Sequence, residues 1–400
     1  MKALRTAIFW CHLVTGVAIA LVVLLMSATG VLLTYQKQLT RWADTRGMDG
    51  APRAGADRML PVDSLLAHAR ALVPDAAPTA VTWRRDPSAP VEIAFGRERT
   101  LFVDAYTGEV LGDGSAAMRR FFKVTTDLHR WLALSGARRA HGKAITGAAN
   151  LGFLFLVLSG FWLWWPRNWT RAAFRNVGLP RRGLAGKARD FNWHNAIGIW
   201  SLLPLVVIVA SGVVISYPWA SRLVYRAFGE SPPPPAERTP QGEARPAHRA
   251  GVPRSHRELD AVRAVAERRM PEWRSATVQL PRPAAKTMVI ALDAGSGGQP
   301  QRRATLTIDR ATGTERKWEP FGAGSPARRA RSILRFAHTG EVGGVLGQTV
   351  AGLVSLGAVL LVWTGLALAW RRHRGWRART RLARRQTRTA EPTTADERVA

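Results

Sequence analysis

Long apolar blocks alternate with polar segments along the chain. Four blocks run near Ile8–Thr34, Ala144–Trp165, Ala196–Tyr217 and Val345–Trp370. A hydrocarbon layer about 30 Å thick needs roughly 20 apolar residues in a helix, and each block is long enough. The pattern therefore predicts four transmembrane helices. We interpret the first as a retained anchor, because its apolar core is too long for a signal peptide.

Aromatic side chains mark the ends of these blocks, as expected at a membrane interface. They are Trp10, Tyr35, Trp162, Trp164, Trp165, Trp193, Tyr217, Trp219 and Trp370.

Basic residues in the short loops predict the orientation. Lys2 and Arg5 precede the first block. The loop between the second and third blocks contains seven Arg and Lys residues, from Arg167 to Arg189, and a single acidic residue, Asp190. An Arg-rich tail begins at Arg371. Positive charge favours the cytoplasmic side. We therefore expect a multi-pass protein of the bacterial inner membrane with both termini in the cytoplasm.

The formal net charge of +30 is mostly a consequence of this topology. We expect the Arg tail to contact anionic membrane lipid, and we do not expect nucleic acid as a partner. The single cysteine, Cys11, excludes disulfides within the chain and a thiolate cluster.

The two polar segments between the blocks show the same order of elements. Each predicts one helix, Asp63–Leu72 or Glu258–Arg269, followed by short strands. The strands are predicted near Ala80–Arg84, Val91–Phe95 and Thr100–Val110, and near Ser275–Gln279, Thr287–Leu292 and Ala304–Arg316. The last strand of each set contains a turn with Asp104 or Asp309 and a Thr-Gly pair, which we attribute to turn chemistry rather than catalysis. The prolines Pro232–Pro235 predict a stiff spacer before the second set.

The membrane blocks repeat as well. His12, Gly16, Thr29, Gly30, Thr34 and Tyr35 have the spacing of His194, Gly198, Ser211, Gly212, Ser216 and Tyr217. Gly142, Gly147, Gly160 and Trp165 have the spacing of Gly347, Gly352, Gly365 and Trp370. The sequence thus predicts a membrane α-helical four-helix bundle with two extracytoplasmic α+β domains, built as a tandem parallel repeat.

The predicted organisation follows the chain in eight parts. They are a first membrane helix (1–35), a first outer domain (36–128), an amphipathic lead-in with the second membrane helix (129–166), a basic cytoplasmic loop (167–190), a third membrane helix (191–218), a second outer domain (219–332), a fourth membrane helix (333–371) and a basic cytoplasmic tail (372–400).

Several motifs together resemble the PepSY-associated transmembrane family over nearly the whole chain except the tail. They begin at Phe9 (Phe-Trp-Cys-His), Asp127 (Asp-Leu-His-Arg-Trp-Leu), Gly142 (Gly-Lys-Ala-Ile-Thr-Gly), Leu163 (Leu-Trp-Trp-Pro-Arg), Phe191 (Phe-Asn-Trp-His-Asn) and Arg335 (Arg-Phe-Ala-His-Thr-Gly-Glu-Val-Gly-Gly). The Asp-x-x-Thr-Gly turns resemble PepSY domains, so the outer domains are expected to be PepSY-like.

Four of the nine histidines, His12, His129, His194 and His338, are predicted at the leading ends of the four membrane helices. A histidine at membrane depth predicts function. The topology places His12 with His194 near the cytoplasmic face and His129 with His338 near the outer face. Two facing imidazoles at each level are typical of a b-type haem site in a helical bundle.

Zinc is the competing metal, but it prefers about four ligands at one place, whereas each level of the bundle supplies two histidines. Gly16 and Gly198, one turn after His12 and His194, are expected to leave room for the macrocycle. We therefore predict two haem b groups. His141 is an alternative to His129 at the outer level, and His68, His248, His256 and His373 are given no role.

Two stacked haems predict transmembrane electron transfer. The family resemblance implies a ferric-siderophore reductase of the inner membrane, with the ferric siderophore as the outer acceptor. The chain has no Gly-x-Gly-x-x-Gly fingerprint, so we expect another protein on the cytoplasmic side, or a quinol, as electron donor.

Two other functions are compatible with this sequence. PepSY-like domains also occur in a non-enzymatic envelope sensor, assembly factor or peptidase regulator. Transport is disfavoured because Glu341 is the only acidic residue near a membrane block that could mark a substrate path.

Overall fold

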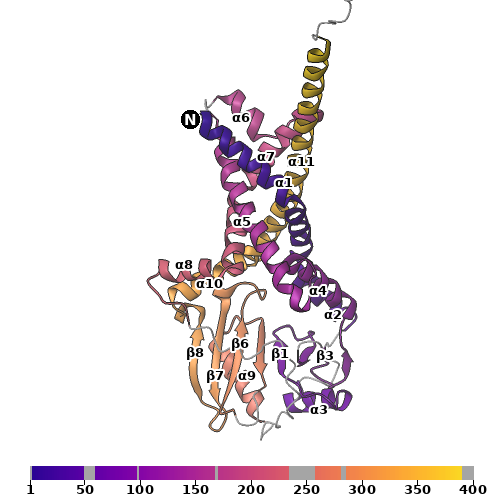
Figure 1. Ribbon diagram of the computed structural model, residues 1–400. Helices are drawn as coiled ribbons and strands as arrows, with labels where there is room; N and C mark the ends of the chain where they lie inside the picture. Colours follow the sequence, from indigo (N-terminus) through magenta and orange to yellow (C-terminus); the bar gives the residue numbers. More distant parts are fainter. Residues whose placement is uncertain are drawn as a thin grey trace, which may run out of the picture. The chain divides into compact units, whose positions relative to one another are not determined.

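The computed structural model describes residues 2–48, 59–96, 99–166, 170–233, 257–280 and 285–389 (Figure 1). Arg167, His248, His256 and the end of the predicted proline spacer lie outside these residues. The chain forms two compact units. The helical unit comprises Met1–Val31, Leu128–Ala210 and Gly352–Ala400, and the sheet unit comprises Leu32–Asp127 and Ser211–Ala351.

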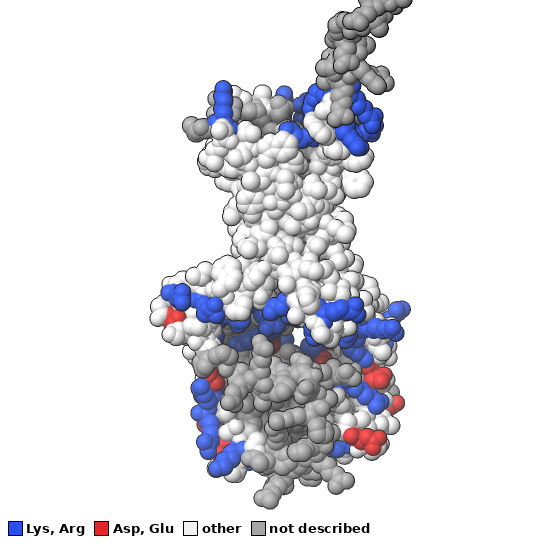
Figure 2. Space-filling view, viewed as in Figure 1, with Lys and Arg blue, Asp and Glu red and all other residues white. Residues whose placement is uncertain are grey.

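The four predicted membrane helices are confirmed as helices long and apolar enough to cross a membrane. They are α1 (Lys2–Leu33), α5 (Arg139–Trp164), α7 (Gly186–Ser216) and α11 (Gly344–Thr389), with the short α6 (Arg171–Gly178) before α7. Apolar side chains on their surface are widely exposed, with Leu203 at 76% and Trp363 at 67%. On the face that Figure 2 shows, the helical unit is almost free of charged residues between its two ends, which suits contact with lipid.

Small residues let the helices of each repeat approach closely. A Cβ at Gly152 of α5 would lie 3.0 Å from Ile19 of α1, and a Cβ at Gly357 of α11 would lie 3.0 Å from Ser201 of α7. These contacts occupy corresponding positions of the repeat, so α1 packs on α5 as α7 packs on α11. A buried cluster that includes Val157, Leu205, Val209, Val354 and Ala358 then joins α5, α7 and α11.

The basic segments meet at one end of the helical unit. Arg5 donates to the carbonyl of Leu163 at 2.5 Å. Arg371 pairs with the buried Asp190 at 3.2 Å, and the Arg372 guanidinium lies 4.8 Å from the ring centre of Trp10. The three segments whose charge set the predicted orientation therefore lie on the same side of the helices.

The sheet unit contains one eight-stranded antiparallel sheet. Its strands are β1 (Ala80–Arg84), β2 (Val91–Phe95), β3 (Arg99–Val103), β4 (Val110–Gly112), β5 (Ser275–Gln279), β6 (Thr287–Asp293), β7 (Arg303–Asp309) and β8 (Glu315–Pro320). The spatial order is β4-β3-β2-β1-β5-β6-β7-β8. The strands occur where the sequence predicted them. The segment predicted as the last strand of each set forms a hairpin of two strands, β3 with β4 and β7 with β8.

The junction between the two halves of the sheet was not expected. β1 pairs with β5 along its whole length, and the hydroxyls of Thr82 and Thr277 are 2.9 Å apart at the centre of that pairing. The prediction of two separate outer domains is therefore not confirmed, because both polar segments contribute to one sheet. An edge strand in each half exposes unpaired backbone groups, and pairing the two edges satisfies both.

One hydrophobic core serves both halves of the sheet. Helices α3 (Val62–Leu72) and α9 (Arg257–Arg269) contribute Leu65, Leu66 and Ala266 to the same buried cluster as Val81 and Val278. Buried and less buried residues alternate along β1, β2, β5 and β7, as expected for strands with one face on the core.

The two Asp-containing turns show the predicted turn chemistry. Asp104 accepts from the backbone N–H groups of Tyr106 and Thr107, and Asp309 accepts from those of Ala311 and Thr312. The pKa of Asp309 is lowered by its hydrogen bond with Arg316 and by these backbone donors. Both carboxylates are thus engaged in turn geometry.

Four further helices were not predicted as separate elements: α2 (Gln36–Thr45), α4 (Ala116–Trp131), α8 (Pro218–Ala227) and α10 (Pro326–His338). An acidic residue near the end of α2 binds the start of α4, and one just after α8 binds the start of α10. Asp44 accepts from the Ser115 N–H and Arg119, and Glu230 accepts from the Ser325 hydroxyl and the Ala327 N–H. Anions at helix N-termini are stabilising, which accounts for the repeated arrangement.

A sharp turn separates α4 from α5 and α10 from α11. Leu132 and Ala133 have positive φ in the first turn, and Gly340 has φ 73° in the second. A Cβ at Gly142 would lie 2.1 Å from the carbonyl oxygen of Trp131, and a Cβ at Gly347 would lie 2.2 Å from that of Gly340. Both glycines are therefore required where the short helix turns back on the long one.

We expect Gly142→Ala to destabilise the protein by about 1–3 kcal/mol, because the added methyl group collides with backbone that cannot rotate away. The measurement is the thermal midpoint of the detergent-purified protein. Gly375→Ala is the matched control, since Gly375 is also helical and has nothing within 4 Å of the place that an added methyl group would take. Equal midpoints for the two variants would contradict the close contact at Gly142.

Candidate functional site

The structure places the four candidate histidines differently from the sequence prediction in one respect. His12 and His194 lie within α1 and α7, as expected. His129 lies near the end of α4 and His338 is the last residue of α10, so neither leads a membrane helix. The chain turns between each of them and the following long helix, so the prediction that His129 and His338 lie at the leading ends of membrane helices was wrong.

His12 is held by a hydroxyl group on the neighbouring helix. Its Nδ1 lies 2.8 Å from Oγ of Ser159 in α5. That hydroxyl donates its proton to the carbonyl of Phe155 at 2.6 Å. A hydroxyl has one proton to donate, so Ser159 accepts from the imidazole. We infer that His12 carries its proton on Nδ1, which leaves Nε2 as the basic nitrogen.

His194 repeats this arrangement on α7 and α11. Its Nδ1 lies 3.0 Å from Oγ1 of Thr364, and Thr364 donates to the carbonyl of Leu360 at 2.8 Å. His12 and His194 belong to the same unit. The hydroxyl contact uses Nδ1 in both rings, so Nε2 is the nitrogen that remains for a ligand.

The other two histidines also contact hydroxyl groups. His129 Nδ1 lies 2.9 Å from Thr29 of α1, whose hydroxyl donates to the carbonyl of Leu25 at 2.6 Å. His338 Nδ1 lies 3.4 Å from the hydroxyl of Ser211 in α7. Thr29 and Ser211 occupy matching positions in the repeat. Each places a hydroxyl beside a histidine ring, which explains why α1 and α7 both carry a hydroxyl at this position.

Glycines lie against three of the rings. A Cβ at Gly160 would be 3.4 Å from Cε1 of His12, one at Gly365 would be 3.4 Å from Cε1 of His194, and one at Gly30 would be 3.8 Å from Cε1 of His129. Gly16 and Gly198, expected to leave room for a macrocycle, face Leu156 and Leu361 instead. Both glycines thus lie at van der Waals distance from a leucine side chain of the neighbouring helix.

Ser159 and Thr364 were not recognised from the sequence. The signal was present, because each directly precedes a glycine, Gly160 or Gly365, of the repeat. A histidine that binds a metal usually donates its other N–H to a fixed acceptor, so a hydroxyl at matched positions in both halves could have been sought.

The donor set fits an axial pair better than a zinc site. The described residues contain no group of three or more His, Cys, Asp or Glu side chains that could hold a metal ion. A hexacoordinate haem iron takes two imidazoles, each through a nitrogen that carries no proton. His12 and His194 meet this requirement, because the hydrogen bonds at Nδ1 leave Nε2 unprotonated.

The remaining described histidines have other surroundings. His141 lies in the first turn of α5 and is exposed, whereas His129 is half-buried and bonded to Thr29. This difference favours His129 over His141 as a ligand. His68 packs against the backbone of Gly108, where a Cβ would lie 2.3 Å from its Nδ1. His373 is exposed, and its ring lies near those of Trp370 and Trp376.

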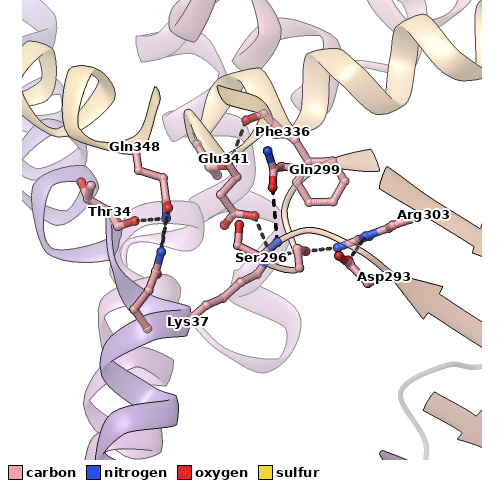
Figure 3. A network of polar contacts seen from close by, with 12 residues as sticks. Thr34, Lys37, Asp293, Ser296, Gln299, Arg303, Phe336, Glu341 and Gln348 are labelled. Carbon is pink, nitrogen blue, oxygen red and sulfur yellow. Dashed lines mark hydrogen bonds and ion pairs between the residues drawn. The ribbon is translucent and has the colours of Figure 1, made fainter. Parts of the chain in front are cut away.

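A polar network surrounds the turn that follows His338 (Figure 3). Lys37 at the start of α2 pairs with Glu341 at 2.5 Å and donates to the carbonyl of Gly297 at 2.7 Å. Arg303 also donates to that carbonyl and pairs with Asp293 at 2.8 Å. The loop after β6 is thereby fixed to α2 and to the turn between α10 and α11, within the sheet unit.

The same network has an aromatic centre and a tight glycine contact. The cations of Lys37, Arg303 and Arg335 lie 5.4, 5.0 and 5.8 Å from the ring centre of Phe336. A Cβ at Gly298 would lie 2.3 Å from Cβ of Glu341. Glu341, the one residue that suggested transport, is thus engaged in an ion pair at the base of α11.

Close to this network (Figure 3), Gln348 of α11 donates to the carbonyl of Thr34 at 2.7 Å and accepts from Gln38 at 2.7 Å. Gln348 is almost completely buried. These bonds hold the end of α1 against the start of α11.

Four membrane-length helices joined to an antiparallel sheet define a membrane protein with a folded polar unit. The chain belongs to the family described as the PepSY-associated TM region, whose family model matches residues 9–372. The family expectation from the sequence motifs is therefore confirmed. No curated protein matches the chain.

We expect Lys37→Met to destabilise the sheet unit by about 1–3 kcal/mol, because it leaves the mostly buried carboxylate of Glu341 without its cation and removes one of the two donors to the Gly297 carbonyl. The measurement is the chemical unfolding midpoint of the purified protein. The control is Lys123→Met, which breaks the exposed pair with Asp127. That pair should contribute less than about 0.5 kcal/mol. Similar losses in both variants would show that Lys37 has no special role.

Proposed function

We propose that this protein transfers electrons across the bacterial inner membrane through two b-type haems. His12 and His194 would hold one haem. His129 and His338 would hold the other, a pairing that rests on the sequence repeat. The observation that supports this proposal best is that all four imidazoles meet a Ser or Thr hydroxyl at Nδ1.

The residues of the chain prepare the ligands in three ways. Ser159, Thr364 and Thr29 accept the Nδ1 proton, which fixes the tautomer and the ring orientation. The carbonyls of Phe155, Leu360 and Leu25 hold these hydroxyls in the accepting role. When bound, a bis-histidine haem exchanges one electron at a time, and its filled axial positions disfavour oxygen chemistry.

The direction of transfer follows from the basic end of the helical unit. Positive charge favours the cytoplasmic side, so both termini and the end that carries Arg5, Arg371 and Arg372 face the cytoplasm. Electrons are received near His12 and His194 and are delivered near His129 and His338. The acceptor is extracytoplasmic, and the family resemblance supports a ferric siderophore, whose iron is reduced and released.

The first test is the absorbance spectrum of the protein purified after expression with haem supply. We expect a Soret band and a dithionite-induced α-band, with two haems per chain. His12→Ala, His129→Ala, His194→Ala and His338→Ala should each lose about one haem, because an axial pair that lacks one imidazole binds weakly.

His141→Ala and His373→Ala are the matched controls and should retain both haems. A colourless protein of normal folding would overturn the proposal and favour an envelope sensor, assembly factor or peptidase regulator. Retention of haem in His129→Ala with loss in His141→Ala would reassign that ligand.

A second test addresses the hydroxyl groups. Thr364→Val keeps the shape of the side chain but removes the acceptor for His194 Nδ1. We expect haem to dissociate about 10–100-fold more readily, as is usual when such a partner is lost, with band positions unchanged. Haem transfer to apomyoglobin measures the rate.

Thr380→Val is the control for this test. Thr380 lies on the same helix, and its hydroxyl also donates to the carbonyl four residues earlier, but this hydrogen bond is exposed. If Thr364→Val and Thr380→Val release haem at the wild-type rate, the hydroxyl does not support the ligand.

A further inference from the structure

An open cavity lies in the helical unit, and its wall includes Trp193, the residue before His194. It is formed by the loop between α6 and α7 and the first turns of α7, and its volume is about 440 Å³. Ligand pockets for small molecules span roughly 300–1,000 Å³. The residues that matter in its wall are Pro180, Arg181, Arg182, Arg189 and Trp193.

Hydrogen bonds from α7 fix the loop in place. The buried Asn192 donates to the carbonyl of Leu179 at 3.0 Å and accepts from the N–H of Arg181 at 2.8 Å. The indole of Trp200 donates to the carbonyl of Gly178 at 2.8 Å. The walls of the cavity are therefore built by the fold before any ligand arrives, which lowers the entropic cost of binding.

The charge of the cavity is strongly positive. Asp190 is the only acid between residues 167 and 190, and it is buried and occupied by Arg189 and Arg371. Arg182 is exposed at the cavity wall. Guanidinium groups bind phosphate and carboxylate through paired hydrogen bonds, so this wall selects an anion.

The wall also contains one aromatic side chain, Trp193. Trp193 is 39% exposed, and the guanidinium carbon of Arg189 lies 5.9 Å from its ring centre. Indole and guanidinium surfaces both stack on planar rings. Trp193 also precedes His194 directly, which puts their Cα atoms about 3.8 Å apart.

We propose that this cavity binds an anionic aromatic reductant, with the chemistry of a reduced flavin nucleotide. Arg181 and Arg182 receive its phosphate, and Trp193 receives its ring. A quinol carries no anion for the arginines to recognise. A nicotinamide nucleotide delivers hydride, whereas an iron centre takes one electron at a time, which a reduced flavin can supply.

The donor role rests on the proposed function, because His194 is taken as a haem ligand. The reduced flavin loses two electrons and two protons and becomes the oxidised flavin. The two haems that the proposed function assigns to the histidines would accept one electron each, and the protons go to solvent. The binding site itself involves residues outside the proposed haem ligands, so it can be tested separately.

The experiment measures binding of oxidised flavin mononucleotide to the full-length protein in zwitterionic nanodiscs, by quenching of flavin fluorescence. We expect saturable binding that Arg181→Gln and Arg182→Gln each weaken at least about tenfold, the loss expected for one charge-assisted bond to phosphate. Riboflavin, which lacks the phosphate, should bind as weakly to wild type as the nucleotide does to these variants.

Arg175→Gln is the matched control, since it removes the same charge from α6 outside the cavity wall and should leave the affinity unchanged. Equal weakening by Arg175→Gln, or none by Arg181→Gln and Arg182→Gln, overturns the proposal. Loss of binding when nanodiscs contain anionic phosphatidylglycerol also overturns it, because the cavity then holds lipid headgroups. Haem content is measured on the same samples, so binding without haem would refute the proposed function and leave the flavin site.

Discussion

An imidazole within a membrane-length helix must place its N–H on an acceptor, since lipid offers none. This constraint organises the helical unit. A Ser or Thr hydroxyl can serve as acceptor only if its own proton is engaged, and the carbonyl one turn earlier engages it. Each such histidine therefore needs a hydroxyl on a neighbouring helix at the right depth. The close packing of α1 on α5 and of α7 on α11 follows from that need and from the glycines that permit it.

The repeat is expressed in contacts as well as in residues. His12 with Ser159 corresponds to His194 with Thr364, and Gly160 corresponds to Gly365 beside the rings. The short helices α4 and α10 follow the same rule, because each begins at an acid-bound N-terminus and ends near a histidine. A chain that duplicates one helical pair thus obtains the same environment twice.

The sheet unit uses its repeat differently. Each half has a helix and four strands, but the edge strands β1 and β5 pair with each other, so the halves share a core. The polar network of Lys37, Glu341, Arg303 and Gly297 then fixes the loop after β6 beside the turn that follows His338. In this way the sheet is linked to the segment that carries a candidate ligand.

The sequence by itself determined the membrane helices, nearly every strand, the family and the residues of interest, because long apolar blocks, period-two patterns and a tandem repeat are local signals. Only the tertiary structure decided that β1 joins β5, that α4 and α10 end before the long helices begin, and that Ser159 and Thr364 meet His12 and His194. These features depend on edge pairing, on a turn against Gly142 and on contacts between helices far apart in sequence. No local pattern records them, since each is a relation between two segments.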